Sequence, residues 1–140
     1  MKYWDSSAVI PLLIHEDSSA IMEDRLRDDP AVATWWGTMV ECASALARLE
    51  RDGALAADDV RDALARSREA AAGWIEVPAS SDVREQAMRL LRVHPLRAGG
   101  ALQLAAAIIA ADFQPNALEF VTLDARQADA AEREGFRIAP

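Results

Sequence analysis

The sequence has a single cysteine, a single lysine and no long apolar run. Cys42 alone excludes an internal disulfide framework and an all-thiolate metal site, and such sparse cysteine is typical of a reducing cytoplasm. The longest near-apolar stretch, 101–111, is interrupted by Gln103 and is well short of the roughly 20 residues that span a bilayer. Lys2 is followed by Asp5, with no apolar region or small-residue cleavage site after it, so we expect no secretory signal and no membrane partner.

Positive charge is scarce as well. The chain has 15 basic and 23 acidic side chains, a formal net charge of −8, and fourteen of its cations are arginine. A chain of this charge does not hold phosphate backbones by general attraction. Its 140 residues are 51% hydrophobic, but thirty of them are alanine and the mean hydropathy is −0.04. This composition predicts one helix-rich, cytoplasmic domain over residues 1–140.

Short apolar segments alternate with longer stretches of helical spacing. The segments that indicate strands are 2–4, 31–34, 74–77, 119–123 and 136–138. A first helix is expected from Ser6 onward, and further helices over 18–28, 38–51, 58–72, 82–93, 101–113 and 126–134. This alternation indicates βαβ units, so we predict the α/β class with a mostly parallel central sheet of about five short strands and helices on both faces.

Two aspartates directly follow predicted strands, Asp5 after 2–4 and Asp124 after 119–123. Ligands of open α/β sheets bind beyond the carboxyl ends of the strands, and a charge placed there needs a partner or an ion to offset its desolvation. The alternative is that each aspartate caps the N-terminus of the helix after it. Two aspartates at equivalent positions favour a shared anionic pocket.

Glu41 is the third candidate ligand. Thr38, Glu41, Ala45 and Arg48 follow one another at intervals of three or four residues, so they share one stripe of the predicted helix. Because this stripe contains small residues, we expect Glu41 to lie beside a crevice. The alternative is that Glu41 is exposed to solvent. Three converging carboxylates form a hard oxygen site suited to Mg²⁺ or Mn²⁺. Zinc is not favoured, because neither histidine has a partner at zinc-ligand spacing.

Four motifs occur in order along the chain. They are YWDSSAVI at 3–10, Glu41 in a helix that continues to ALAR at 45–48, LRA at 96–98 before ALQLA at 101–105, and VTLD at 121–124 followed by AA at 130–131 and GF at 135–136. Each is weak alone, but the ordered set resembles the PIN-domain family over essentially the whole chain. Within that family the chain is most similar to the VapC-type toxins of bacterial toxin–antitoxin pairs.

The resemblance implies an endoribonuclease that depends on Mg²⁺ or Mn²⁺ and cuts structured RNA such as tRNA or rRNA. It implies Asp5, Glu41 and Asp124 as catalytic residues and metal ligands, with Ser6 and Thr122 in support of the ligands or the attacking water. It also implies a three-layer PIN-like fold with about seven helices, an antitoxin partner and a homodimer. The net charge favours an antitoxin with a basic segment that enters the acidic crevice.

The sequence departs from the family pattern at Gly100, where family members have a further aspartate before Ala-Leu. Loss of one of four carboxylates lowers the affinity for a dication, and Gly99 with Gly100 is expected to fray the first turn of its helix. Three interpretations stay open. The glycine was introduced to silence a toxic nuclease, or the chain is a natural, catalytically silent module that binds an antitoxin or RNA, or three carboxylates suffice for activity.

Several other residues have two interpretations each. Arg97 and Arg126 flank the proposed crevice, where they contact RNA phosphate or a partner, or else pair with carboxylates. Asp129 lies five residues after Asp124 and points either toward the pocket or away from it. Trp35 and Trp36 cover the sheet edge, or with the acidic stretch 17–29 they form a partner surface.

Two other protein classes that place aspartates at strand ends do not match. Receiver domains are expected to have a lysine after the last strand, and the only lysine here is Lys2. Phosphatases with an Asp-x-Asp nucleophile need a second carboxylate two residues after Asp5, where this chain has Ser7.

Overall fold

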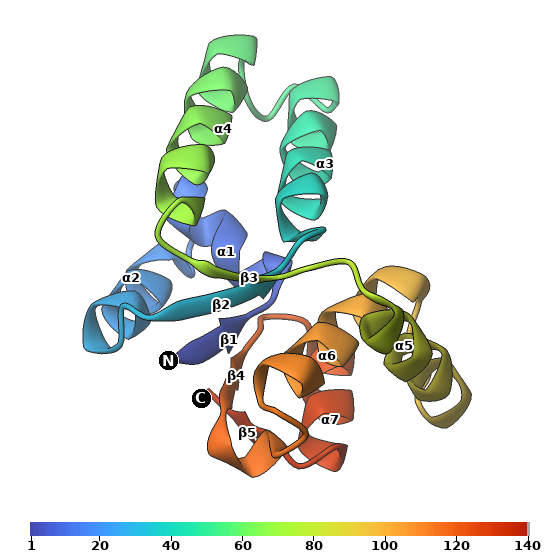
Figure 1. Cartoon of the computed structure of the whole chain (residues 1–140). Helices are drawn as coiled ribbons and strands as arrows, with labels where there is room; N and C mark the ends of the chain where they lie inside the picture. The colour runs from blue at the N-terminus through green and yellow to red at the C-terminus, as the bar shows by residue number, and fades with distance from the viewer. Residues whose placement is uncertain (140) are drawn as a thin grey trace.

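The computed structural model describes residues 1–139, in which seven α-helices surround one five-stranded sheet (Figure 1). The strands are β1 (Lys2–Trp4), β2 (Val32–Trp35), β3 (Ile75–Val77), β4 (Glu119–Val121) and β5 (Arg137–Ile138). The helices are α1 (Ser6–Leu13), α2 (Ser19–Asp28), α3 (Thr38–Arg51), α4 (Ala57–Ala71), α5 (Ser81–Val93), α6 (Ala98–Ala110) and α7 (Ala125–Arg133), with a 3₁₀ turn at Pro115–Ala117. The predicted α/β class and the numbers of strands and helices are confirmed.

The strand order is β3-β2-β1-β4-β5, and all neighbouring strands within the described residues are parallel. The chain starts at the centre, builds β2 and β3 on one side of β1, and then crosses over to build β4 and β5 on the other side. The order therefore reverses between β1 and β4, and such a switch point is where open α/β sheets bind ligands. Trp4 pairs with Val121 in register, so the residues that follow them leave the sheet side by side.

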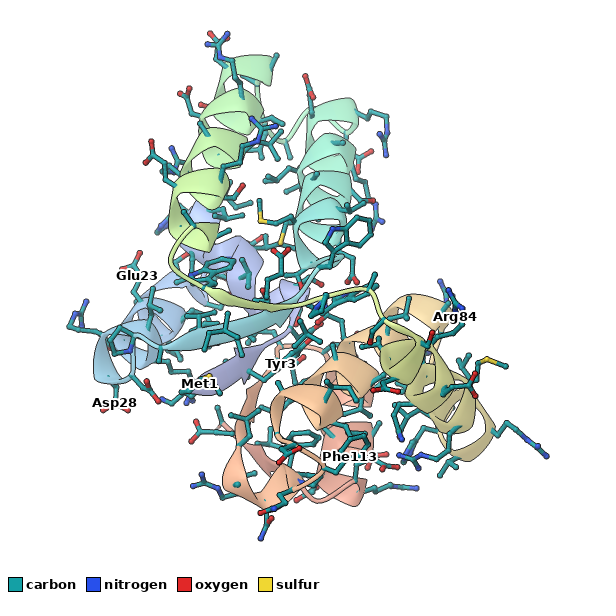
Figure 2. The ribbon with its side chains drawn as sticks, in the orientation of Figure 1. Met1, Tyr3, Glu23, Asp28, Arg84 and Phe113 are labelled. Atoms are coloured by element: carbon teal, nitrogen blue, oxygen red, sulfur yellow. The ribbon has the colours of Figure 1, made fainter. Side chains whose placement is uncertain are left out.

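Alternating side chains of the strands enter two separate cores. Tyr3 and Phe120 point to one face, where α5, α6 and α7 pack, and Trp4 and Val121 point to the other, which α1 to α4 cover. Figure 1 shows the resulting three layers, with α3 and α4 side by side above the sheet, and Figure 2 places Tyr3 between the strands and α6. A shift of one residue in either central strand would exchange the two sets, so the pattern fixes the register.

The start and end of α6 differ from the sequence-based prediction. The helix begins at Ala98 and contains both Gly99 and Gly100, so the expected fraying of its first turn is wrong. The side chain of Gln127 donates a hydrogen bond to the Gly100 carbonyl (2.8 Å), which ties this turn to α7. The helix ends at Ala110 instead of residue 113, because Asp112 and Phe113 have positive φ.

The predicted strand at 119–123 is also shorter in the structure. It ends at Val121, because Thr122 leaves the ladder and its hydroxyl donates to Asp5. The only lysine, Lys2, begins β1, at the end of the strand away from Asp5, and its ammonium group lies 3.2 Å from Asp28. Figure 2 shows Asp28 near Met1. No helix within residues 1–139 has the length and apolar content needed to cross a membrane.

Candidate active site

A cleft of about 590 Å³ opens beyond the carboxyl ends of β1 and β4. The starts of α1, α6 and α7 surround it together with one face of α3, from Glu41 in its first turn to Arg48 in its last. Its lining residues are Ser6, Glu41, Arg48, Pro95, Leu96, Arg97, Gly99, Gly100, Asp124, Arg126 and Gln127. The cleft therefore collects most of the site residues that the sequence predicts, from four separate parts of the chain.

Asp5 directly precedes Ser6 of this lining, is not itself a lining residue, and is 5% exposed. Its Oδ2 accepts hydrogen bonds from the hydroxyls of Ser7 (2.6 Å) and Thr122 (2.8 Å), which are themselves 3.1 Å apart. Asp5 occupies the N-cap position of α1 but accepts no capping bond there. Two hydroxyls hold its carboxylate in place, and the backbone N–H of Ser7 makes a smaller contribution that also lowers the pKa of Asp5.

Glu41 is half-buried and lines the cleft, as its place on the small-residue stripe predicts. The Ser6 hydroxyl donates to its Oε2 at 2.8 Å. Its Oε1 lies 3.9 Å from the position that a Cβ on Gly99 would take, so this carboxylate reaches across to α6. Within residues 1–139, Asp5, Glu41 and Asp124 have no ion pair with a cationic side chain.

Asp124 is exposed, and its carboxylate caps α7. Its Oδ1 accepts hydrogen bonds from the backbone N–H groups of Arg126 (2.8 Å) and Gln127 (3.1 Å). The capping alternative is correct for this aspartate. With Asp124 turned to α7 and Asp5 held by hydroxyls, no three acidic, histidine or cysteine side chains in the described chain gather around one ion position.

Negative charge at the site is incompletely compensated. Burial raises the pKa of Asp5 and of Glu41, and the hydroxyls that donate to them offset part of that rise. Burial, with the nearby carboxylates Asp5 and Glu41 as a smaller cause, also raises the pKa of the Cys42 thiol to about 12. A bound cation would relieve the same cost, and a donor set of oxygen atoms alone fits Mg²⁺ or Mn²⁺.

Gly100 is the position where the resemblance to PIN domains predicts an aspartate, and the Gln127 side chain fills the space beside it. A Cβ on Gly100 would lie 2.7 Å from Gln127 Oε1 and 3.6 Å from Leu96 Cδ2. Gln127 is 3% exposed. Sequence reasoning missed this residue, although one signal was present. Gln127 shares a face of α7 with the buried alanines 130 and 131, where a polar side chain is out of pattern.

Three arginines line the cleft. Arg97 and Arg126 lie where the sequence predicts them, while Arg48, which shares the stripe of Glu41, was not proposed as a contact. All three are exposed, and none is within 4.0 Å of a carboxylate among residues 1–139, so the ion-pair alternative is not realised. Asp129 pairs with Arg133 at 3.2 Å and does not line the cleft.

The tryptophan pair is divided between core and surface. Trp35 is buried at 8% exposure and belongs to the core under α5 and α6, whereas Trp36 is 57% exposed. Their rings meet edge to face with centroids 6.2 Å apart. One ring therefore covers the sheet and the other lies on the surface.

Comparisons with known proteins indicate the fold. No family model matches the sequence, and no curated protein matches it. A solved structure titled "Toxin-antitoxin complex from Klebsiella pneumoniae" contains a similar chain, with a TM-score of 0.60 and 18% sequence identity over 89% of this chain and 87% of that chain. The two chains share their fold over most of their lengths.

Proposed function

We propose that this chain is the toxin of a toxin–antitoxin pair and acts as an endoribonuclease that uses Mg²⁺ or Mn²⁺ to cut structured RNA. The observation that carries the proposal is the pair Asp5 and Glu41, two carboxylates without a cationic partner at the switch point of the sheet. The fold shared with a chain of a toxin–antitoxin complex supports the biological setting. The ordered motifs of the PIN-domain family support the chemistry.

Asp5 and Glu41 would hold the cation, and Asp124, which caps α7 in this structure, would join them only by turning its carboxylate into the cleft. A divalent cation bound there would supply Lewis acidity, which would lower the pKa of a water molecule and offset negative charge at the scissile phosphate. The chain's own contribution is orientation. The hydroxyls of Ser7 and Thr122 fix Asp5, and Ser6 fixes Glu41, so both carboxylates are positioned before RNA arrives.

Arg48, Arg97 and Arg126 would bind the RNA phosphates that flank the scissile bond. Arginine binds phosphate through two parallel N–H groups, and these guanidinium groups are not paired within the described chain. Because the net charge is −8, RNA binding depends on this local group of cations and not on the overall field. A homodimer and an antitoxin whose basic segment enters the cleft belong to the same proposal.

A second candidate function is a catalytically silent module that binds an antitoxin or RNA. Gly100 favours it, because the position that would carry a further carboxylate has no side chain. The two candidates differ in one measurable property, which is metal-dependent cleavage.

The test uses this chain and its Gly100→Asp variant with total tRNA and rRNA, in Mg²⁺, in Mn²⁺ and in EDTA. Gly73→Asp is the matched control, since Gly73 lies outside the cleft with an ordinary φ and only one neighbouring atom at 3.7 Å. Adding Asp5→Asn to either active form identifies contaminating ribonuclease, because authentic cleavage must disappear. Metal-dependent cleavage by the parent or by Gly100→Asp supports the nuclease, and cleavage by neither favours the silent module.

A further inference from the structure

Gln103 is a fully buried polar residue inside an apolar helix. It is 0% exposed, and the other buried residues of α6 are alanine, leucine and isoleucine. Its Oε1 accepts a hydrogen bond from the Tyr3 hydroxyl at 2.7 Å, and its Nε2 donates to Thr38 Oγ1 at 3.1 Å. Because a buried amide lowers stability unless its polar atoms are paired, a glutamine in this core indicates a role for these hydrogen bonds.

The two hydrogen bonds connect the elements that carry the proposed site. Tyr3 lies in β1, two residues before Asp5. Thr38 begins α3, and Glu41 follows three residues later in the same turn. Because the Tyr3 hydroxyl donates to Oε1, the NH₂ of the Gln103 amide must point to α3. Gln103 therefore links the strand that precedes Asp5 to the first turn of the helix that carries Glu41.

The indole of Trp35 reaches the same turn from β2. A Cβ on Gly37 would lie 2.8 Å from Trp35 Nε1, so the indole N–H lies against the start of α3. Trp35 is 8% exposed, and its Nε1 has no hydrogen-bond partner among residues 1–139. Burial raises the pKa of Glu41, whereas the Ser6 hydroxyl, the Gln103 amide and the Trp35 indole lower it as donors. Two buried N–H groups therefore act on this carboxylate in addition to the Ser6 hydroxyl.

We propose that Gln103 is a positioning residue, which fixes Glu41 relative to Asp5 for the ligand of the cleft. Gln103 does not line the cleft, so it acts through Glu41 and not on the ligand. The Ser6 hydroxyl holds Glu41 Oε2 at the cleft, while Gln103 holds the first turn of α3 from the core. The inference rests on the proposed function, which makes Glu41 a cation ligand. The alternative is that Gln103 serves only the packing of α6 against α3 and β1.

The first experiment needs no cation. The four indole N–H groups of the ¹⁵N-labelled chain are observed by NMR in EDTA, and Trp35→Phe identifies the signal of Trp35. Glu41→Gln is expected to shift this signal, because it removes the negative charge beside the indole N–H. On a Gln103→Leu background, Glu41→Gln should shift it about twofold less, since Glu41 is then no longer held in place. No shift in the parent, or an equal shift on both backgrounds, would overturn the inference.

The second experiment measures Mn²⁺ binding by isothermal titration calorimetry, without RNA. Gln103→Leu is expected to weaken binding about tenfold, as loss of a residue that orients a ligand does. Gln86→Leu, the same change on α5 outside the cleft, should leave binding unchanged. On a Glu41→Gln background, Gln103→Leu should have no further effect, because it acts through Glu41. Losses that simply add would favour the packing role.

Tyr3→Phe keeps the inference testable if Gln103→Leu fails to fold, judged by thermal unfolding in EDTA. It removes one hydroxyl at constant shape and leaves the Gln103 amide free to turn. We expect the same reduced response of the Trp35 signal to Glu41→Gln, and weaker Mn²⁺ binding. Values like those of the parent in both measurements would count against the inference.

The outcomes separate this inference from the proposed function. If Asp5→Asn loses Mn²⁺ binding while Gln103→Leu binds like the parent, the cation site stands and the role of Gln103 is wrong. If Asp5→Asn itself binds like the parent, the cation site and the proposed function fall. The response of the Trp35 signal to Glu41→Gln then decides alone whether Gln103 positions Glu41.

Discussion

The two sides of the cleft treat negative charge in opposite ways. On the β1 side, Asp5 and Glu41 are withdrawn from solvent and held by serine and threonine hydroxyls, without a cationic side chain. On the α6–α7 side, Asp124 is used as a helix cap, and Gly100 and Gln127 bring no charge. The β1 side therefore holds two carboxylates in fixed positions, whereas the α6–α7 side has one carboxylate, which is bound to backbone N–H groups.

The difference shows how a fold can keep an anionic site without an internal counter-ion. A lysine or arginine beside Asp5 would stabilise the apo chain but would compete with any bound cation. Hydroxyl donors stabilise the carboxylates only in part, as the raised pKa values of Asp5 and Glu41 show. The remaining charge is available to a ligand, so binding of a cation and stability of the fold are coupled.

Asp5→Asn is expected to have the largest effect on Mn²⁺ binding, because it removes a carboxylate from the β1 side of the cleft. Loss of a residue that only supports a ligand weakens metal binding about 10–100-fold, so loss of the buried ligand itself should exceed about 100-fold. In EDTA the same variant should melt at a higher temperature than the parent, because a buried charge is removed. Calorimetry with Mn²⁺ and thermal unfolding in EDTA measure both effects, and unchanged binding would remove Asp5 from the site.

Thr122→Val is expected to have the next largest effect on Mn²⁺ binding. The change removes one of the two hydroxyl donors to Asp5 Oδ2 at nearly constant volume, so Mn²⁺ binding should weaken about 10–100-fold. Thr34→Val, on buried strand β2 outside the cleft, is the matched control. If both variants bind Mn²⁺ equally well, the hydroxyl contact to Asp5 is structural only.

The pH dependence of stability gives a smaller effect with a defined sign. Because the pKa values of Asp5 and Glu41 are raised on folding, the folded chain binds more protons than the unfolded chain. Their contribution to stability is full below the ordinary values of 3.8 and 4.5 and is lost as the pH rises through the raised values.

Other carboxylates titrate over the same range, so the measurement is a difference between two chains. In EDTA, the melting temperature of Asp5→Asn minus that of the parent should grow as the pH rises from about 4 to 7. A change of 1 kcal/mol in the free energy of unfolding moves the melting temperature by roughly 4 °C at this size, which is readily measured. Mn²⁺ should stabilise the parent and reduce the difference, and a pH-independent difference would contradict the raised pKa.

Arg97→Ala is expected to have the smallest effect, confined to RNA binding. One lost phosphate contact should weaken RNA binding a few-fold and lower the slope of log affinity against log salt by about 1. Arg61→Ala is the control, because Arg61 pairs with Asp58 on α4 and does not line the cleft. Filter binding at several salt concentrations, on an Asp5→Asn background that does not cut, measures the slope, and equal slopes would exclude Arg97 from the RNA path.

The positions of Asp5 and Glu41 on the β1 side of the cleft could be predicted from local sequence. An aspartate after an apolar strand and a glutamate on a stripe of small residues are visible within a few positions, and both side chains lie where that pattern indicates. The two roles of aspartate at strand ends could not be separated in this way. Asp5 binds hydroxyls and Asp124 caps a helix, and the difference depends on Thr122, which is 117 positions from Asp5.

The contact between Gly100 and Gln127 on the α6–α7 side could not be predicted, for a related reason. Gln127 matters because of a space beside Gly100, 27 positions earlier, and nothing local to either residue indicates that they meet. The start of α6 was mispredicted for the same reason. Glycine lowers the intrinsic stability of a first turn, but the bond from Gln127 and the packing of α5 on α6 hold it.

The hydrogen bond between Thr122 and Asp5 also has a consequence for the order in which the site forms during synthesis. The ribosome makes Asp5 first and its hydroxyl partner Thr122 117 residues later, and β1 and β4 must pair before the two side chains meet. Domains generally fold as units as they emerge, so a nascent chain that stops before β4 lacks this contact. The hydrogen bond from Thr122 to the Asp5 carboxylate therefore forms only after β4 and Thr122 have been made.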